Sequence, residues 1–138
     1  IYRDRLWSGA DMVGLGVSSF GHLGGIHYQN ITNIDHYCDS VEVKKAPVRR
    51  ALMTQEEERF IRELILQWKL GRVDKKYFQK KFGISVTERF SLIITKWKEN
   101  GDLIEEGDYL VLIRDALLRV DSLLHQFFLP HHQDARYV

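Results

Sequence analysis

The feature of this sequence that most constrains its fold is a glycine-rich block between Asp11 and Asn30, DMVGLGVSSFGHLGGIHYQN. Five glycines surround a short apolar stretch, and His, Tyr, Gln and Asn follow them. Glycines at this density mark backbone that takes positive φ angles or lies very close to another group. Polar side chains just after a buried strand are common ligand contacts in α/β folds. The block therefore predicts a short buried strand over residues 12–17, whose end contacts a ligand.

The spacing of these glycines does not match the dinucleotide-binding fingerprint G-x-G-x-x-G. Gly14 and Gly16 fit its first two positions, but Ser19 stands where the third glycine belongs. The glycines that follow would also interrupt the helix that such a site requires. A strand end with a glycine-lined turn is the purely structural alternative.

Histidine and cysteine spacing gives no support for a metal centre or a nucleophile within the chain. Of six histidines, His22 and His27 lie five residues apart, which is not the i, i+3 or i, i+4 spacing of a helical metal site. They remain candidates for polar contacts to an anionic ligand. Cys38 is the single cysteine, so the chain has no internal disulfide, and a reducing, cytoplasmic setting is the simplest interpretation.

Charge and hydropathy argue against a nucleic-acid-binding protein and against a membrane protein. The 138 residues carry a net charge of +1, which gives no overall attraction to nucleic acid or to an anionic membrane. No apolar run is long enough to cross a bilayer, and no signal-like segment opens the chain. The sequence lacks an initiator Met and is expected to enter a strand almost at once, as a C-terminal piece of a longer protein would.

Two domains are expected, residues 1–51 and residues 52–138. The first is irregular and glycine-rich, with a short strand, a helical turn over 34–38 and an exposed loop over 41–50. In the second, T-x-x-E and S-x-x-E capping boxes at Thr54 and Ser85 start helices, and Asp74 caps another between them. A hairpin of residues 103–105 and 109–113 follows around a Gly-Asp turn, and a last helix covers 115–129. This order predicts an α+β, mainly α fold with a winged-helix-like module.

The module raises the possibility of DNA binding, because six basic residues and only two acidic ones lie between Arg72 and Arg89. The expected wing is acidic, however, with Asp102, Glu105, Glu106 and Asp108. An acidic wing would be repelled by a phosphate backbone. A packing module with a solvated charged face is the simpler interpretation.

Taken together, GLGVSSFG, then YQN, then ELILQWKLG before three helices and a hairpin resembles the C-terminal part of the oxygen-independent coproporphyrinogen III oxidases, a radical SAM family. The match runs over nearly the whole chain and is most specific at residues 14–20, 28–30 and 63–71. The resemblance implies a parent protein whose partial (β/α) barrel binds a four-iron four-sulfur cluster through a three-cysteine motif, with S-adenosylmethionine beside it. It also implies oxidative decarboxylation of the propionates of coproporphyrinogen III to vinyl groups.

The chain departs from the family pattern in several places. It has no three-cysteine motif, so it cannot build the cluster and is not catalytic by itself. Phe20 falls on a position that contacts a second S-adenosylmethionine, where the family usually has an aliphatic residue. Ile113 and Ala116 stand where relatives usually have Thr and Gly. The family also includes haem chaperones and haem-degrading methyltransferases, so oxidase activity does not follow from this module.

We therefore expect a C-terminal fragment of a radical SAM protein of haem biosynthesis, which covers the barrel and shapes its substrate site. Its partners would be the parent's own barrel and a tetrapyrrole, and neither nucleic acid nor a membrane. The alternatives are a winged-helix DNA-binding or protein-interaction module and a haem chaperone-like or haem-degrading relative. No catalytic or metal-binding residue is expected. The expected cofactor contacts are Gly16, Ser19 and Phe20, and the expected substrate contacts are His22, His27 and Asn30.

Overall fold

The computed structural model describes residues 2–129, with side chains from residue 5 onward. The chain forms two compact units, one of residues up to Gly9 and from Glu56 onward, the other of Ala10–Gln55. Helices and small antiparallel sheets make the fold α+β and mainly α, as the sequence predicts. The domain boundary that we expect after residue 51 lies inside the strand Val48–Met53. The compact unit that contains this strand ends four residues later, at Gln55.

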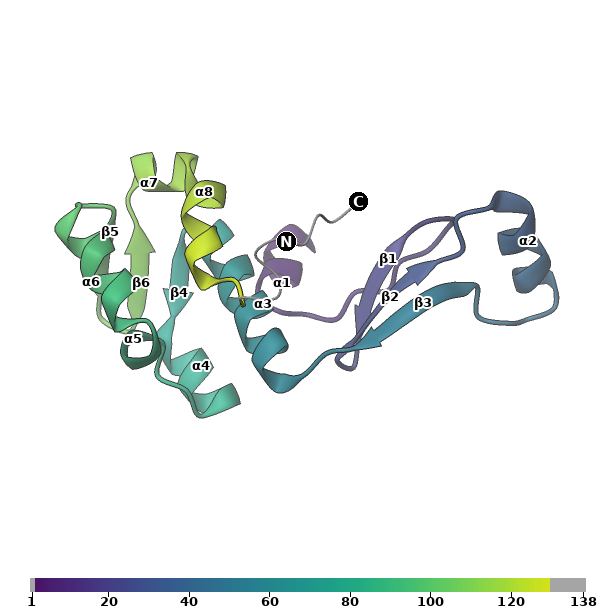
Figure 1. Ribbon diagram of the computed structural model, residues 1–138, viewed down its shortest axis with the longest axis horizontal. Coiled ribbons are helices and arrows are strands. Elements are labelled where there is room, and N and C mark those ends of the chain that lie inside the picture. The colour runs from purple at the N-terminus through teal and green to yellow at the C-terminus, as the bar shows by residue number, and fades with distance from the viewer. Residues whose placement is uncertain (1, 130–138) are drawn as a thin grey trace. The chain divides into compact units, whose positions relative to one another are not determined.

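The larger unit, unit 1, contains the three helical regions and the hairpin that the sequence predicts, in the same order (Figure 1). A short strand that the sequence did not reveal, β4, pairs with β6, and the antiparallel sheet has the order β4-β6-β5. The elements are α1 (Tyr2–Trp7), α3 (Glu56–Lys69), β4 (Arg72–Asp74), α4 (Lys75–Phe82), α5 (Val86–Arg89), α6 (Ser91–Glu99), β5 (Leu103–Glu106), β6 (Tyr109–Leu112), α7 (Arg114–Leu118), α8 (Val120–Leu124) and a 3₁₀ turn (His125–Phe127).

Capping residues set the helix ends in unit 1. The Asp74 carboxylate accepts the Tyr77 N–H at the start of α4, and Gly83 ends that helix with a φ of 66°. The Ser85 hydroxyl accepts the Glu88 N–H, which confirms the predicted cap. The single last helix predicted over 115–129 is wrong. The chain leaves helical geometry at Arg119, with a φ of −115°, where its guanidinium pairs with the buried Asp102.

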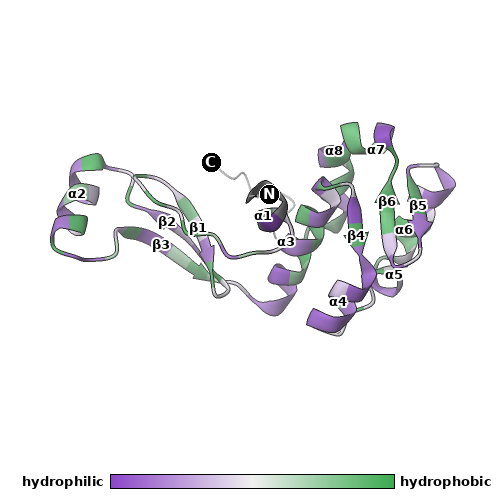
Figure 2. Cartoon of the chain, turned by 180° about the vertical axis from the view of Figure 1, so that it is seen from behind, coloured by the Kyte–Doolittle hydropathy of each residue, from purple (hydrophilic) through white to green (hydrophobic). Residues whose placement is uncertain are grey.

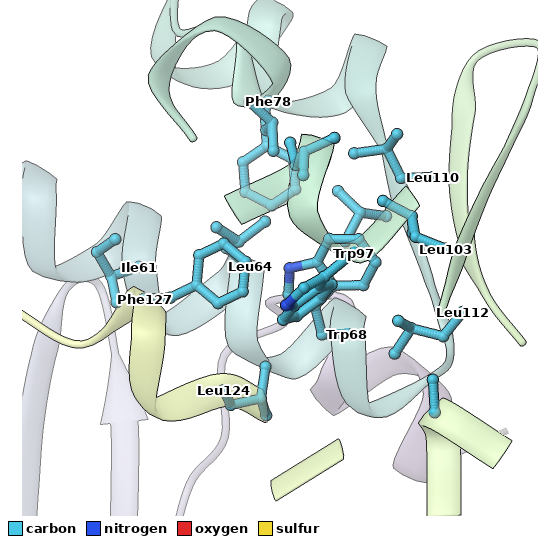
Figure 3. Close-up of a cluster of buried hydrophobic side chains, with 14 of the residues drawn as sticks. Ile61, Leu64, Trp68, Phe78, Trp97, Leu103, Leu110, Leu112, Leu124 and Phe127 are labelled. Carbon is cyan, nitrogen blue, oxygen red and sulfur yellow. The ribbon is translucent and has the colours of Figure 1, made fainter. Parts of the chain in front are cut away.

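The core of unit 1 centres on aromatic side chains. Trp68 on α3 and Trp97 on α6 meet edge to face with ring centroids 5.3 Å apart, and Phe127 lies 5.2 Å from Trp97 (Figure 3). Such pairs add to the stabilisation from their buried area. The predicted apolar face of α3 is confirmed, since Phe60 and Leu64 are also fully buried.

A buried carboxylate connects the N-terminal segment to α3 and α4. The Glu63 side chain is 6% exposed and accepts hydrogen bonds from the Tyr77 hydroxyl at 2.6 Å and the Lys81 ammonium at 2.8 Å. A Cβ on Gly9 would lie 2.8 Å from the Glu63 Cδ, and Gly9 has a φ of +87°. Only glycine fits at this approach.

Unit 2 is a three-stranded antiparallel sheet in the order β1-β2-β3, with a helix between the second and third strands. The elements are β1 (Phe20–Leu23), β2 (Ile26–Asn30), α2 (Ile34–Glu42) and β3 (Val48–Met53). The sequence led us to expect an irregular segment with a loop over residues 41–50. This prediction is wrong, because the segment forms three strands and β3 begins inside the expected loop. The predicted helical turn is confirmed and is longer than expected.

The strand predicted over residues 12–17 is also wrong. Met12 forms an isolated bridge with His22 on β1, and the chain then leaves extended geometry. The φ angles of Gly16 and Ser18 are +97° and +61°, and both lie outside the strand region. The apolar residues of this stretch had indicated a strand, but the glycines among them turn the backbone.

Unit 2 has little cover over its apolar side chains. Every buried hydrophobic residue in the described part of the chain belongs to unit 1. Val13 and Val17 are 57% and 37% exposed, which confirms the expectation that they are poorly covered, whereas Met12 is half-buried. Figure 2 shows hydrophobic residues along β3 and α2, and among these Leu52, Met53 and Ile34 are exposed. Large contiguous apolar patches on a protein surface often belong to interaction sites.

No helix among the described residues is both long and apolar enough to cross a membrane.

Candidate functional site

The candidate site is built around residues 14–19, which we call the glycine loop. Two tyrosine hydroxyls accept hydrogen bonds from its backbone. The Gly14 N–H donates to the Tyr28 hydroxyl at 3.1 Å, and the Gly16 N–H donates to the Tyr37 hydroxyl at 3.0 Å. Tyr28 belongs to β2 and Tyr37 to α2, so two elements that follow the loop in sequence hold it in place.

Asn30, at the end of β2, completes this arrangement. Its side-chain amide donates to the carbonyl oxygens of Gly14 at 3.0 Å and Gly16 at 2.9 Å. Asn30 is 3% exposed, and its own N–H donates to the Ser19 carbonyl at 2.9 Å. Both hydrogens of the amide are therefore used within the chain, and a buried amide with its bonds satisfied stabilises one loop conformation.

Close packing within unit 2 explains two of the glycines. A Cβ on Gly14 would lie 2.1 Å from the Phe20 carbonyl oxygen, and a Cβ on Gly21 would lie 2.2 Å from the Tyr28 ring. Gly16 needs no such approach, because its nearest neighbour would be 3.6 Å away, but its φ of +97° favours glycine. The glycine pattern thus reflects contacts inside the chain as well as any ligand.

Aromatic rings gather on one face of the sheet. Phe20 on β1 and His27 on β2 stack with ring centroids 5.9 Å apart and planes 18° apart. His22 pairs directly with His27 across the strands, and their ring centroids are 6.0 Å apart. Phe20 is 46% exposed and His27 is exposed, whereas His22 is 5% exposed. Two stacked rings open to solvent offer a flat surface with a polar imidazole edge.

The six predicted site residues fall into two groups. Gly16, Ser19 and Asn30 belong to the glycine loop and its support, and the Ser19 hydroxyl donates to the Leu15 carbonyl at 2.7 Å. The other three lie together on β1 and β2, where Phe20 stacks on His27 and the buried His22 ring is tilted against His27. Sequence reasoning missed the roles of Tyr28 and Tyr37. Tyr37 lies in the helical turn that was predicted, but only the fold shows that its hydroxyl meets Gly16.

The basic residues considered for DNA binding are largely paired with carboxylates. Lys75 and Lys98 both bind Glu105, and they lower its pKa from 4.5 to about 2. The hydrogen bond from Lys76 to Asp108 raises the pKa of that lysine. Lys81 binds Glu63 and Arg89 binds Glu57 in the same way. The acidic wing thus neutralises part of the basic patch instead of leaving it open to phosphates.

The ligands for an iron–sulfur cluster are not in this chain. Such clusters are held by several cysteine thiolates. Cys38, the only cysteine, lies exposed on α2. The described residues also contain no group of three or more His, Cys, Asp or Glu side chains placed to hold a metal ion. These residues do not fit an iron–sulfur cluster.

No family model matches the sequence. Two curated relatives are oxygen-independent coproporphyrinogen III oxidases. That of Helicobacter pylori is 26% identical over 87 residues, 62% of this chain and 19% of the relative. That of Pseudomonas aeruginosa is 31% identical over 85 residues, 59% of this chain and 18% of the relative. The chain thus matches about a fifth of the length of these relatives.

The solved structure of coproporphyrinogen III oxidase from Escherichia coli, described as a radical SAM enzyme, resembles this fold with a TM-score of 0.67. The similarity covers 86% of this chain and 28% of that one, at 16% sequence identity. The chain is therefore similar in sequence and in fold to a portion of the oxygen-independent coproporphyrinogen III oxidases, consistent with a C-terminal part of such a protein.

Proposed function

We propose that this chain is the C-terminal part of a radical SAM oxidoreductase that acts on coproporphyrinogen III or a related tetrapyrrole in the cytoplasm. The observation that carries the proposal is the agreement of sequence and fold with the same group of oxidases. In this proposal the parent's N-terminal barrel holds the cluster and S-adenosylmethionine. The present chain would cover that barrel and complete the ligand site.

The exposed apolar surface of unit 2 supports a role as one half of a larger site. Leu23, Ile26 and Met53 pair across the three strands, so they lie on one sheet face, and they are 50%, 38% and 77% exposed. Water contact at such a face is unfavourable by about 25 cal/mol for each Å² of apolar surface. Cover by the parent barrel would remove this cost.

The glycine loop is proposed as the cofactor contact. Gly16 and Ser19 of the loop, together with Phe20 at the start of β1, would approach a second S-adenosylmethionine molecule. The Ser19 hydroxyl already donates within the loop, so it would serve the ligand as an acceptor. Phe20 offers an exposed ring for stacking. The S-adenosylmethionine held by the barrel beside the cluster would supply the radical chemistry of this enzyme class, and the residues here would orient the second molecule.

The stacked rings are proposed as the tetrapyrrole contact. A tetrapyrrole is large, flat and rich in carboxylates, and apolar surfaces with a few polar groups suit such ligands. His27, whose ring lies nearly parallel to that of Phe20, can donate an imidazole N–H to a propionate oxygen. His22 lies behind them and would orient His27. In this proposal Asn30 acts on the substrate site through the loop that it holds.

The test is an anaerobic assay of the full-length protein with its cluster reconstituted. Coproporphyrinogen III and S-adenosylmethionine are added, and the tetrapyrrole product is identified by mass spectrometry. The proposal expects loss of carbon dioxide from propionate side chains, with consumption of S-adenosylmethionine. Unchanged coproporphyrinogen III under these conditions would contradict the oxidase assignment.

Three further measurements on the same preparation distinguish the rivals. Tight binding of haem, seen as a new Soret band without tetrapyrrole decarboxylation, would favour a haem chaperone-like relative. Degradation of added haem with methyl transfer would favour the haem-degrading relatives. A DNA-binding module would bind duplex DNA with an affinity that falls as salt rises. The pairing of Lys75, Lys76, Lys81 and Arg89 with carboxylates leads us to expect no such affinity.

A further inference from the structure

We infer that Tyr28, Asn30 and Tyr37 are positioning residues, which hold the glycine loop in the conformation that contacts the cofactor. The inference rests on the proposed function of that loop. It assigns the three residues no contact with the cofactor itself. Their contribution would be to fix the backbone on which Gly16, Ser19 and Phe20 are carried.

The three side chains hold alternate residues of the loop. At Gly14, the N–H donates to Tyr28 and the carbonyl accepts from Asn30. At Gly16, the N–H donates to Tyr37 and the carbonyl accepts from Asn30. The backbone donors and acceptors of both glycines are thus paired with side chains of β2 and α2. A loop held by this many bonds has few alternative conformations.

Leu15, between the two held glycines, has the opposite character. Its side chain is 83% exposed, and no described residue accepts a hydrogen bond from its N–H. The loop therefore has one side bonded to its own unit and another side open. The open side is where a ligand can approach without breaking the bonds that fix the loop.

Ser18 shows that the conformation is imposed. Its φ of 61° lies in the left-handed region, which non-glycine residues rarely adopt. The Ser18 N–H donates to the Ile31 carbonyl at 2.9 Å, directly after the strand that carries Tyr28 and Asn30. Unfavourable backbone angles persist when the surrounding structure enforces them, and they concentrate at ligand-binding sites.

Tyr37 also makes the loop sensitive to α2. None of the residues of α2 is buried, and Ile34 and Val41 on this helix are 63% and 49% exposed. The half-buried Tyr37 therefore gives a specific connection between a weakly packed helix and the loop. Any partner that shifts α2 would move the hydroxyl that holds Gly16.

The test uses the full-length protein with Tyr37→Phe, which removes the hydroxyl and keeps the ring. Tyr109→Phe is the matched control, because Tyr109 lies on β6 in unit 1, far along the chain from the loop. Three quantities are measured in each protein. Hydrogen exchange reports on the loop amides without any ligand, and a thermal scan gives the midpoint of unfolding. Equilibrium dialysis gives the number of S-adenosylmethionine molecules bound and the Kd of the second molecule.

Tyr37→Phe is expected to speed exchange of the Gly16 amide and to raise the Kd about five- to tenfold, as for the loss of one hydrogen bond. The thermal midpoint should change little, and Tyr109→Phe should match the wild type in both measurements. A faster exchange with an unchanged Kd would overturn the positioning role, because the bond would then be only structural. If the wild type binds one S-adenosylmethionine but no second molecule, this inference fails while the radical SAM assignment stands. If it binds none, the proposed function fails as well.

Discussion

Replacement of the buried Glu63 by Gln tests how strongly α3 is bound to α4 in unit 1. Glu63 accepts from the Tyr77 hydroxyl at 2.6 Å and from Lys81 at 2.8 and 2.9 Å. Glu63→Gln keeps the size of the side chain and removes its charge. The amide oxygen can still accept from Tyr77, but the charge-assisted bonds are lost.

The expected loss follows from these contacts. Hydrogen bonds to charged groups contribute about 1.5–3 kcal/mol each when buried. The Lys81 side chain is 43% exposed, so solvent screens its ion pair with Glu63, and this pair contributes about 0.5–1 kcal/mol. Because the Gln amide oxygen can still accept from Tyr77, part of that bond is kept. The total loss in the free energy of unfolding is then about 2 kcal/mol. Lys81→Met should cost at least as much, because it leaves a buried carboxylate without its cation.

The same cluster predicts a change of stability with pH. Burial and the hydrogen bond to Glu63 raise the pKa of Tyr77 above 10.0. Burial lowers the pKa of Lys81, but its bonds to Glu63 and Tyr77 outweigh this effect and raise it above 10.5. The folded protein therefore holds both protons more tightly than the unfolded chain does. This stabilisation is complete below about pH 10 and is lost as the pH rises through the folded pKa values.

Urea unfolding followed by tryptophan fluorescence measures these effects, since Trp68 and Trp97 lie in the core of unit 1. Glu106→Gln on β5 is the control, because Glu106 is an exposed carboxylate, and we expect a change within about 0.5 kcal/mol. Glu63→Gln should also lose less stability than the wild type between pH 10 and 12. A Glu63→Gln protein as stable as the wild type at pH 7 would refute the reasoning.

Three further predictions concern single residues. Glu105 has a pKa of about 2, so its stabilisation is present above pH 4.5 and lost as the pH falls through about 2. Glu105→Gln should flatten acid unfolding curves in that range. Arg119→Met leaves Asp102 buried without its cation, so it should lower the free energy of unfolding by about 2 kcal/mol, seen as a lower urea midpoint. An unchanged midpoint would show that the pair behaves as an exposed one. Gly14→Ala should speed proteolysis within residues 12–19, because its Cβ would meet the Phe20 carbonyl, and wild-type resistance would contradict this packing.

The helices of unit 1 could be predicted from the sequence because their signals are local. Capping side chains at Asp74 and Ser85 and a glycine at Gly83 act within one turn of the helix that they end or start. The hairpin was equally clear from its Gly-Asp turn. The break at Arg119 was not, since it coincides with an ion pair to Asp102, seventeen residues earlier in the chain.

Unit 2 was predicted poorly because its signals come from distant residues. The strands β1 and β3 each pair with the central strand β2. Their apolar side chains remain exposed, so the sequence shows no clear alternation of apolar and polar residues that would predict them. Within the glycine loop, Gly14 is required by the carbonyl of Phe20, and Gly16 by its φ angle. The glycine pattern correctly indicated unusual backbone geometry in this segment, and its role as a ligand site stays a prediction. The tyrosine contacts that hold it could come only from the fold.

The central claim is that this chain forms part of a larger radical SAM protein. It is tested most directly by the sequence of the reading frame upstream of Ile1. The proposal predicts that the frame continues upstream and encodes a C-x-x-x-C-x-x-C motif, whose cysteines would hold the cluster that this chain cannot. A start codon directly before Ile1, or a long upstream frame without that motif, would contradict it.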